Sequence, residues 1–347
     1  MQKVGVGIVG YGLAGAVFHA PLVSSVDGFE LQKIVSSNAA KIKADYPNVE
    51  VVTSVDELLA DSTLELVVIA APNTAHYPIA KQALLAGKHV VVDKPFTNTS
   101  QEADELIQLA VETNRLLSVF QSRRWDNDFL TIKDCIKSGL LGEIYSYEAH
   151  YDRFRPEVRN RWREQALPGS GMLYDLGSHL IDQALHLFGL PQTIFADLQK
   201  QRPGSDVIDY FHLLLGYDRL RVVLHSGSVV RKPGPHFQIH GSQGSFIKYG
   251  LDSQEDTLKA GGRPGDAGWG ADKAELWAEI TTDMAGLTFT GKIETLPGAY
   301  ENYYSQLLKA IREGQPLPVQ AHEARATIKV IEKAMQSSQE KREVVFE

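Results

Sequence analysis

Three glycines near the start of the chain have the spacing of a phosphate-binding turn. The segment Gly10-Tyr11-Gly12-Leu13-Ala14-Gly15 follows an apolar run over 4–9 and precedes a helical pattern over 13–26. In that context Gly10 permits a tight turn, Gly12 lets the backbone approach a pyrophosphate, and Gly15 lets helix and strand pack closely. The N-terminus of the helix would attract the anion. A merely flexible turn could contain the same glycines, but the flanking strand and helix favour a dinucleotide site.

The end of the second expected strand bears on which dinucleotide is bound. A carboxylate there would accept a hydrogen bond from the ribose 2′-hydroxyl of NAD. The sequence instead has Ser36, Ser37 and Asn38, with Lys41 nearby. Two hydroxyls and a lysine suit a 2′-phosphate, which is anionic and accepts hydrogen bonds. Ser37 and Asn38 could equally cap the next helix. We therefore expect NADP, with NAD as the alternative.

Lys94 is a candidate catalytic residue because of where it stands along the chain. It follows the strand-like run 89–92, at the edge of a parallel sheet where ligands bind. Its ammonium could polarise the oxygen of an alcohol or ketone, and Pro95 would stiffen the turn that presents it. Most lysines are simply surface residues, but this position favours a catalytic role.

Asp175 and His179 stand four residues apart, a spacing that places both on one face of a helix. A histidine titrates near neutral pH and can exchange a proton, while the aspartate could orient it or bind a substrate hydroxyl, with Asp182 in a supporting part. Alternatively, His179 is a core histidine and Asp175 a helix cap. Such a pair can also bind metal, but no third ligand is suitably spaced. We expect acid/base chemistry without a metal, and we expect His225, His236 and His240 to be structural.

Two regions with different hydrophobic patterns must fold to position these residues. Up to residue 120, Val/Ile/Leu runs alternate with helical patterns, which predicts a parallel Rossmann sheet. Beyond it, consecutive alternating segments predict a large, mainly antiparallel sheet. We expect a dinucleotide-binding domain over 1–120 and a substrate and oligomerisation domain over 121–347, whose last helix could pack back on the first. The expected strands are 4–9, 29–35, 50–52, 66–70, 89–92 and 116–120, then 142–152, 193–199, 207–216, 220–225, 237–241 and 245–249.

Composition narrows the class of protein. The 347 residues are 43% hydrophobic and 22% charged, which is ordinary for a globular protein of two domains. The net charge of −8 argues against nucleic acid, and the short clusters at 123–124 and 159–163 suit a small anion better. A single cysteine, Cys135, excludes a disulfide framework and is expected to be a core thiol. The start of the chain does not resemble a signal peptide and no apolar run could span a bilayer, so we expect a cytoplasmic protein.

Three motifs in order resemble the glucose-fructose oxidoreductase/inositol dehydrogenase family. They are Ala70-Ala71-Pro72-Asn73 with His76, then Val92-Asp93-Lys94-Pro95, then the run 171–182 that contains Asp175, Gly177, His179 and Asp182. Asp93 departs from the family's usual Glu-Lys-Pro but keeps the carboxylate. The segments 121–126, 152–156, 168–171 and 180–185 are similar to a narrower branch that includes NADP-dependent inositol dehydrogenases. The resemblance covers nearly the whole chain.

The resemblance implies a Rossmann domain followed by an α/β domain with an open, mainly antiparallel sheet, through which members pair as homodimers or homotetramers. It implies hydride transfer at a CH–OH group of a polyol or sugar-like substrate, foremost scyllo-inositol and its ketone. Lys94, His179 and Asp175 would be catalytic and would also contact the substrate. Further substrate contacts are expected from Arg124, Asp126, Tyr151 and Arg153. The expected cofactor contacts are the six residues 10–15, Ser36, Ser37, Lys41, Ala71, Pro72, Asn73, His76, Asp93, Lys94, Gln121, Trp162 and Arg163.

Two other functions fit the same motifs. Another sugar dehydrogenase or a dihydrodiol dehydrogenase of this family would share the lysine and histidine positions. A non-enzymatic NAD(P)-binding sensor or regulator would keep the glycine turn but could lose Lys94 or His179, and this chain keeps both.

Overall fold

The computed structural model describes residues 2–347, which form two compact units. The first contains the chain up to Ser122 together with 254–269 and 299–325, and the second contains 123–253, 270–298 and 326–347. The expected boundary at 120/121 thus lies next to Ser122, and two later segments return to the first unit.

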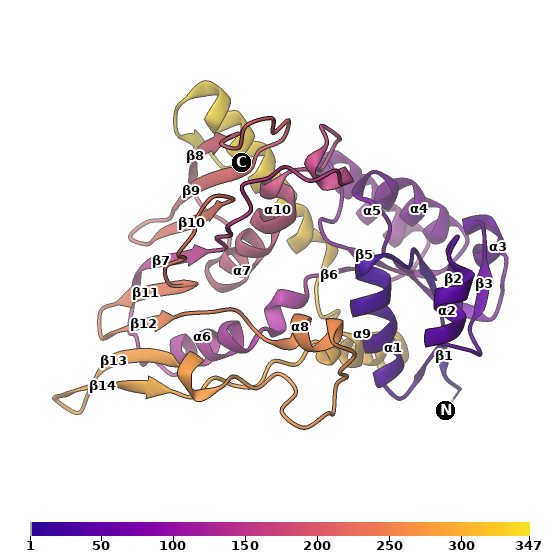
Figure 1. Ribbon diagram of the computed structural model, residues 1–347, viewed down its shortest axis with the longest axis horizontal. Coiled ribbons are helices and arrows are strands. Elements are labelled where there is room, and N and C mark those ends of the chain that lie inside the picture. Colours follow the sequence, from indigo (N-terminus) through magenta and orange to yellow (C-terminus); the bar gives the residue numbers. More distant parts are fainter. Residues whose placement is uncertain (1) are drawn as a thin grey trace. The chain divides into compact units, whose positions relative to one another are not determined.

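A six-stranded parallel sheet forms the core of the first unit (Figure 1). Its apolar runs are buried because helices cover both faces of such a sheet, and every residue of β1 is buried. The expected Rossmann architecture is confirmed. The strand order is β3 (Glu50–Val52), β2 (Phe29–Val35), β1 (Val4–Val9), β4 (Leu64–Ile69), β5 (His89–Asp93), β6 (Leu117–Phe120).

The helix after the glycine turn differs from the single helix expected over 13–26. It is a π-helix over Ala14–His19 followed by the α-helix α1 over Ala20–Ser25. Pro21, near the start of α1, has no N–H and its ring crowds the carbonyl of residue 17, which widens the turn before it. The other helices of this unit are α2 (Ala39–Asp45), α3 (Val55–Leu59), α4 (Asn73–Leu85), α5 (Ser100–Glu112), α8 (Gln254–Lys259) and α9 (Glu301–Glu313).

Helix α9 is distant in sequence but belongs to the core of the first unit. Tyr303 donates a hydrogen bond to Ser118 Oγ at 2.9 Å, and Ser118 donates to the carbonyl of Val319 at 2.8 Å. The Tyr304 hydroxyl lies 2.6 Å from Nδ1 of His19. The last helix, α10 (Ala321–Glu340), belongs to the second unit from residue 326 onward.

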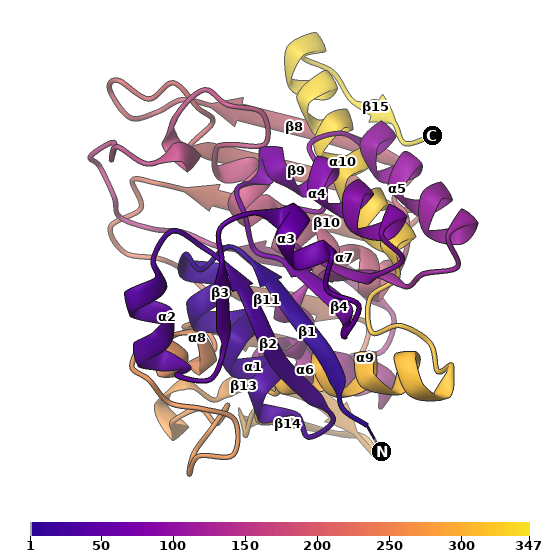
Figure 2. The same ribbon diagram turned by 90° about the vertical axis from the view of Figure 1, so that its right-hand side faces the viewer.

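A nine-stranded mixed sheet forms the second unit, and its neighbouring strands are antiparallel apart from the parallel pair β7 and β10. This confirms the large, mainly antiparallel sheet. Burial alternates along the central strands, as in β9, where Phe211, Leu213 and Leu215 are buried. Helices α6 (Asn127–Lys137) and α7 (Ser178–Phe188) lie on one side of the sheet (Figures 1 and 2). The order is β14 (Leu287–Ile293), β13 (Ala278–Met284), β12 (Gly244–Lys248), β11 (Phe237–Gly241), β7 (Ile144–His150), β10 (Arg221–Gly227), β9 (Tyr210–Gly216), β8 (Thr193–Gln199), β15 (Val344–Val345).

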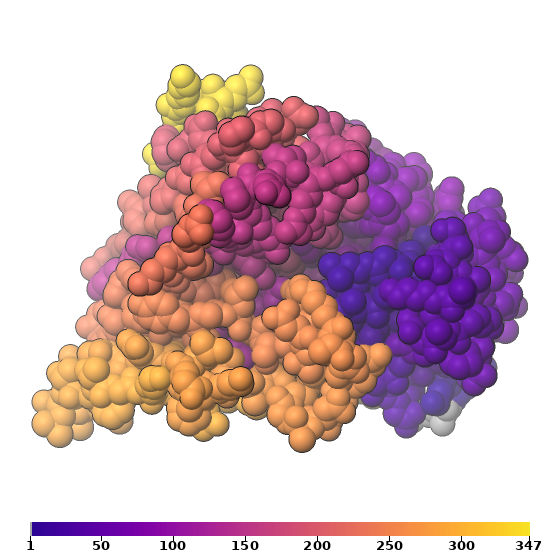
Figure 3. Space-filling model, viewed as in Figure 1, coloured from indigo at the N-terminus to yellow at the C-terminus, as the bar shows by residue number. Residues whose placement is uncertain are grey.

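The hairpin of β13 and β14 was not expected from the sequence. Its two-residue turn, Ala285-Gly286, has positive φ at both positions, the conformation that matches the twist of paired strands. Alanine seldom adopts it, so the dipeptide lacks the usual Asn-Gly or Asp-Gly signature. Strand β14 is largely exposed, and the hairpin lies at the surface in the orange part of Figure 3.

Cys135 is buried on α6, as expected of a core thiol, and burial raises its pKa to about 11. Within residues 2–347, no helix combines the length and apolar character needed to cross a membrane.

Candidate active site

The glycine turn lies at the carboxyl edge of the parallel sheet, where the strand order reverses between β1 and β4. Gly10 has φ +99°, and a Cβ there would lie 2.5 Å from the carbonyl oxygen of Ala70. A Cβ on Gly15 would lie 2.1 Å from the carbonyl oxygen of Gly10, whereas one on Gly12 would meet no heavy atom of residues 2–347 within 4 Å. Gly10 and Gly15 are therefore required by the fold, while Gly12 leaves bare backbone beside open space. This cradle fits a dinucleotide pyrophosphate.

A cationic group stands beside the glycine turn at the end of β2. Lys41 Nζ lies 5.6 Å from the ring centre of Tyr11, and Tyr11 donates a hydrogen bond to Asp45 at 2.9 Å. Burial and this hydrogen bond raise the pKa of Tyr11. Asn38 caps α2 by accepting from the backbone N–H of Lys41, and Ser36 Oγ accepts from the N–H of Asn38. The capping alternative thus holds for Asn38, while Ser37 and Lys41 remain exposed.

Arg263 is a second cation at this place, and the sequence analysis missed it. It belongs to the glycine-rich segment 260–270, a composition typical of a surface loop. The segment joins the first unit, where Arg263 hydrogen-bonds Tyr46 and its charge also acts on Tyr11. Its guanidinium also donates to the carbonyls of Gly261 and Gly262. The signal in the sequence was an arginine within a glycine-rich segment, which can indicate an anion-binding loop. The neighbouring residues did not indicate that this segment packs against the first unit.

His76 joins the loops that follow β4 and β5. Its ring nitrogens lie 2.8 Å from the carbonyl oxygen of Pro95 and 3.0 Å from that of Ala71. Burial lowers the pKa of His76, although the charge of Asp93 opposes this. Because both nitrogens face backbone oxygens, His76 holds the two loops together. Its expected contact with the cofactor stays a prediction.

Lys94 lies beside a buried carboxylate, and its peptide bond to Pro95 is cis. Asp93 accepts a hydrogen bond from the backbone N–H of Lys94 at 2.9 Å, and His19 Nε2 lies 3.6 Å from the same carboxylate. Burial opposes ionisation of Asp93, but the nearby ring of His19 and the charge of Lys94 bring its pKa below the ordinary value. Asp93 is therefore ionised at neutral pH and balances the charge of the Lys94 ammonium.

Two amide side chains are buried near the same sheet edge. Asn73 begins α4, and Gln121 directly follows β6. Gln121 Oε1 is buried and accepts no hydrogen bond from the described residues 2–347. Buried amide oxygens are normally satisfied, so this atom is a candidate contact for a bound cofactor.

Asp175 and His179 lie on consecutive helical segments of the second unit. Asp175 belongs to a π-helix over Leu173–Gly177, and His179 to the first turn of α7. Arg163, from a short 3₁₀ helix over Trp162–Glu164, places NH1 3.6 Å from Asp175 Oδ1. Its guanidinium also lies 5.2 Å from the ring centre of Trp162. The structure pairs Arg163 with Asp175, and the expected contact of Arg163 with the cofactor stays a prediction.

Arg124 is held in a buried, bidentate ion pair with Asp182. Nε and NH2 of Arg124 lie 2.8 and 2.7 Å from the two carboxylate oxygens. Both side chains are at most 4% exposed. Asp182 lies one helical turn beyond His179, so the pair holds the helix that carries the histidine. Arg124, expected to bind substrate, is a positioning residue in the proposal below.

The remaining expected substrate contacts differ in exposure. Asp126 is buried, with Arg123 NH1 3.4 Å from its carboxylate. Tyr151 is buried between the guanidinium groups of Arg123 and Arg153, which lie 5.7 and 5.1 Å from its ring centre. Arg153 is partly exposed and therefore more accessible to a ligand than the other two.

Comparison with known proteins places these features in context. Residues 4–121 match the family model for the oxidoreductase family, NAD-binding Rossmann fold, and residues 133–346 match the model for its C-terminal alpha/beta domain. The scyllo-inositol 2-dehydrogenase (NADP+) of Bacillus subtilis (strain 168) is 47% identical over 100% of this chain and 97% of the relative. An uncharacterized oxidoreductase of Escherichia coli (strain K12) is 46% identical over 97% of each chain. A solved oxidoreductase structure from Bacillus subtilis superposes with a TM-score of 0.97 at 46% identity, covering 100% of this chain and 99% of that chain.

Proposed function

The chain belongs to the glucose-fructose oxidoreductase/inositol dehydrogenase family, and on that premise we propose that it oxidises a secondary alcohol of a polyol with NADP, or reduces the matching ketone. The proposed substrate pair is scyllo-inositol and its ketone, by similarity to the 47% identical Bacillus subtilis enzyme. When bound, the nicotinamide supplies a hydride acceptor or donor.

The observation that carries the proposal is the edge of the six-stranded sheet. The glycine cradle after β1 and Lys94 after β5 lie on the same carboxyl edge, with β4 between their strands. At the usual strand spacing they are about 10 Å apart across the sheet. A binding cradle and a charge-balanced lysine on one edge are what hydride transfer at a polarised C–O group needs.

In this proposal, different residues of the chain stabilise charge, exchange the proton and position the other groups. Lys94 holds the reacting oxygen and stabilises negative charge on it as the hydroxyl proton leaves, with Asp93 balancing the ammonium. His179 exchanges that proton, and Asp175, paired to Arg163, orients it. His76 shapes the loops of the cofactor site, and Arg124 with Asp182 holds the helix of His179.

The preference for NADP rests on charge at the end of β2. Ser36 and Ser37 stand where NAD-binding proteins have a carboxylate, and Lys41 and Arg263 add two cations near Tyr11. A guanidinium carries five N–H donors, more than the carbonyls of Gly261 and Gly262 can occupy. Both cations suit a doubly charged 2′-phosphate.

A screen of inositols and aldoses with NADP and with NAD tests the proposal, following the absorbance of the reduced nicotinamide. We expect the highest kcat/KM with scyllo-inositol and NADP. A higher value with an aldose or a dihydrodiol would replace the substrate but keep the reaction class. Cofactor binding by calorimetry without turnover of any alcohol would favour the sensor alternative. A higher kcat/KM with NAD would contradict the cofactor assignment.

We also propose that the protein forms a homodimer or homotetramer through the nine-stranded sheet. In support, large apolar side chains are exposed on its strands, among them Phe195, Met284, Leu287 and Phe289. Sedimentation velocity with Leu287→Asp/Phe289→Asp is the test, and a monomeric wild-type chain would contradict the assignment.

A further inference from the structure

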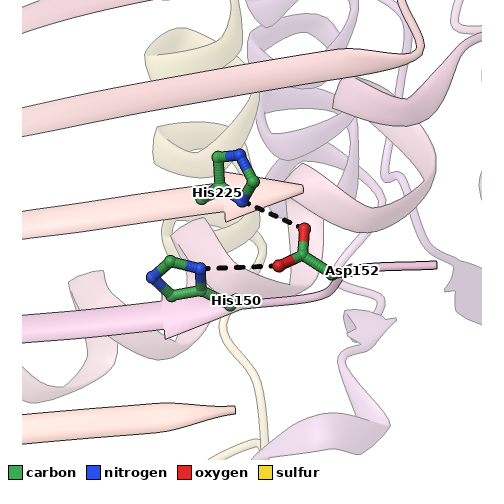
Figure 4. Close-up of side chains that lie close together, drawn as sticks. All are labelled: His150, Asp152 and His225. Atoms are coloured by element: carbon green, nitrogen blue, oxygen red, sulfur yellow. Dashed lines mark ion pairs between the residues drawn. The ribbon is translucent and has the colours of Figure 1, made fainter. Parts of the chain in front are cut away.

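Three polar side chains meet on the nine-stranded sheet at a place that the proposed reaction does not use. His150 ends β7, His225 lies on β10, and the parallel register pairs these two residues directly. Asp152 follows β7 by two residues. In Figure 4 the carboxylate of Asp152 lies between the two imidazoles, which approach it from neighbouring strands.

The position of Asp152 is set by the backbone. Its Oδ1 accepts a hydrogen bond from the N–H of Gly227 at 2.9 Å, just beyond His225 on β10. The carboxylate is only 6% exposed, while the side chains of His225 and His150 are 16% and 29% exposed. A fixed carboxylate beside two partly exposed imidazole side chains is a preformed set of donor atoms.

The distances within the cluster are those of neighbouring ligands. His225 Nδ1 lies 3.0 Å from Asp152 Oδ1, and His150 Nδ1 lies 3.6 Å from Oδ2. One ligand atom from each residue lies within 4.8 Å of the others. In a tetrahedral zinc site with bonds of about 2.0–2.1 Å, ligand atoms are separated by about 3.3 Å. The two carboxylate-to-imidazole distances, each to a different oxygen of Asp152, fall on either side of this value.

His225 gives an independent sign that the cluster is incomplete. Its Nδ1 is buried and forms no hydrogen bond with the described part of the chain, residues 2–347, although it lies 3.0 Å from Asp152 Oδ1. Buried ring nitrogens normally have a partner. A cation shared with the carboxylate would satisfy both atoms.

We propose that His150, Asp152 and His225 form a binding site for one divalent transition-metal cation, with Zn²⁺ as the best match. Two imidazoles and a carboxylate are a ligand set that zinc accepts, with water completing the tetrahedron. Glu148 Oε2, 3.7 Å from His150 Nε2, lies where a carboxylate orients a ligating histidine through its other nitrogen. The ion would link β7 to β10, the parallel pair at the centre of the sheet. The sequence analysis expected no metal because no third ligand was spaced to join Asp175 and His179, and it expected His225 to be structural.

Calorimetry on tag-free, chelator-treated protein titrated with ZnSO₄ at neutral pH tests the site. We expect one Zn²⁺ per chain, a rise in Tm with zinc concentration as mass action requires, and visible absorption of a tetrahedral complex when Co²⁺ is added. Loss of a residue that only hydrogen-bonds a zinc ligand usually weakens binding by about 10- to 100-fold. Because His150 and His225 are proposed as ligands themselves, His150→Gln and His225→Gln should each weaken zinc binding by more than that. Asp152→Asn should weaken it as well while keeping an oxygen for the N–H of Gly227.

Matched controls separate this site from other histidines. His240→Gln changes a histidine of the same sheet whose Nδ1 already lies 2.8 Å from Ser245 Oγ, and it should bind zinc normally. His179→Ala should also keep the zinc stoichiometry, which separates this site from the Asp175/His179 pair. Tm without zinc verifies that each variant is folded.

Absence of zinc binding to the wild-type chain would overturn the proposal and leave a carboxylate that only faces two histidines. Retention of one zinc per chain by the folded double variant His150→Gln/His225→Gln would overturn it as well. Neither result bears on the proposed dehydrogenase activity, which these experiments do not measure.

Discussion

The candidate sites of the two units consist of different kinds of chemical group. In the first unit the backbone dominates: glycines leave a bare cradle, and His76 joins two loops through their carbonyl groups. In the second unit the sites consist of paired charges, namely Arg124 with Asp182, Arg163 with Asp175, and Asp152 with two histidines. In the first unit, we therefore expect substitutions to change binding or stability by filling space beside the backbone. In the second unit, we expect them to lower stability or activity by leaving a charge without its partner.

The strongest expected effect is that of a side chain in the cradle. Gly12→Val should abolish measurable NADP binding in calorimetry while leaving the melting temperature near that of the wild type, because a Cβ at Gly12 meets no protein atom within 4 Å among residues 2–347. Gly15→Val is the matched contrast. Its Cβ would lie 2.1 Å from the carbonyl oxygen of Gly10, so it should destabilise the fold itself. Normal NADP binding by Gly12→Val would contradict the cradle.

The proposed catalytic residues, Lys94 and His179, are tested by their effect on turnover. Lys94→Ala and His179→Ala should each lower turnover by about 10²–10⁴-fold, the usual contribution of a positioned proton-transfer or charge-stabilising group. Cofactor affinity should be retained in both, because the glycine turn is intact. Single-turnover kinetics with the best substrate of the screen would measure this. Near wild-type rates in both variants would refute the catalytic assignment.

The buried pair of Arg124 and Asp182 tests the role of charge in the second unit. Arg124→Met removes the bidentate partner of the buried Asp182 carboxylate, which should lower the free energy of unfolding by about 3–5 kcal/mol in denaturant titrations. The double variant Arg124→Met/Asp182→Leu removes both charges and should recover most of that loss. A double variant no more stable than Arg124→Met would show that packing rather than charge is responsible.

The cations near Tyr11 should affect one cofactor and not the other. Arg263→Met and Lys41→Met should each weaken NADP binding by about 10- to 100-fold, since a hydrogen bond to a charged group contributes about 1.5–3 kcal/mol. NAD, which lacks the 2′-phosphate, should bind as it does to the wild type. Lys43→Met, on the same helix, is the control. Equal losses for both cofactors would indicate a structural effect instead.

The smallest expected effect concerns an ion pair of the first unit, outside the site. Hydrogen bonds from Thr63 and Lys33 lower the pKa of Asp61 to about 2, below its ordinary value of 3.8. The stability that this carboxylate contributes is present above about pH 4 and is lost as the pH falls toward 2. Asp61→Asn should make the free energy of unfolding less dependent on pH between those values. An unchanged slope would contradict the assignment.

Local patterns identified much of the first unit. The strand and helix runs predicted the six parallel strands, and the boundaries of Phe29–Val35 and Glu50–Val52 agree with the structure. The glycine turn and Lys94 could be placed at the sheet edge because each directly follows a buried strand. The π-helix after the turn and the Ala285-Gly286 hairpin were missed, since proline crowding and an alanine with positive φ leave no strong mark in a sequence.

The sequence by itself determined the order of the two domains, the nucleotide-binding turn and the residues at strand ends, because these depend on neighbours along the chain. Only the tertiary structure decided that Arg263 joins the first unit, that Arg124 is held by Asp182, and that His150, Asp152 and His225 meet. Those contacts depend on strand order and register across the sheets. Strand order and register arise from packing of the whole chain, so spacing along the sequence does not encode them locally.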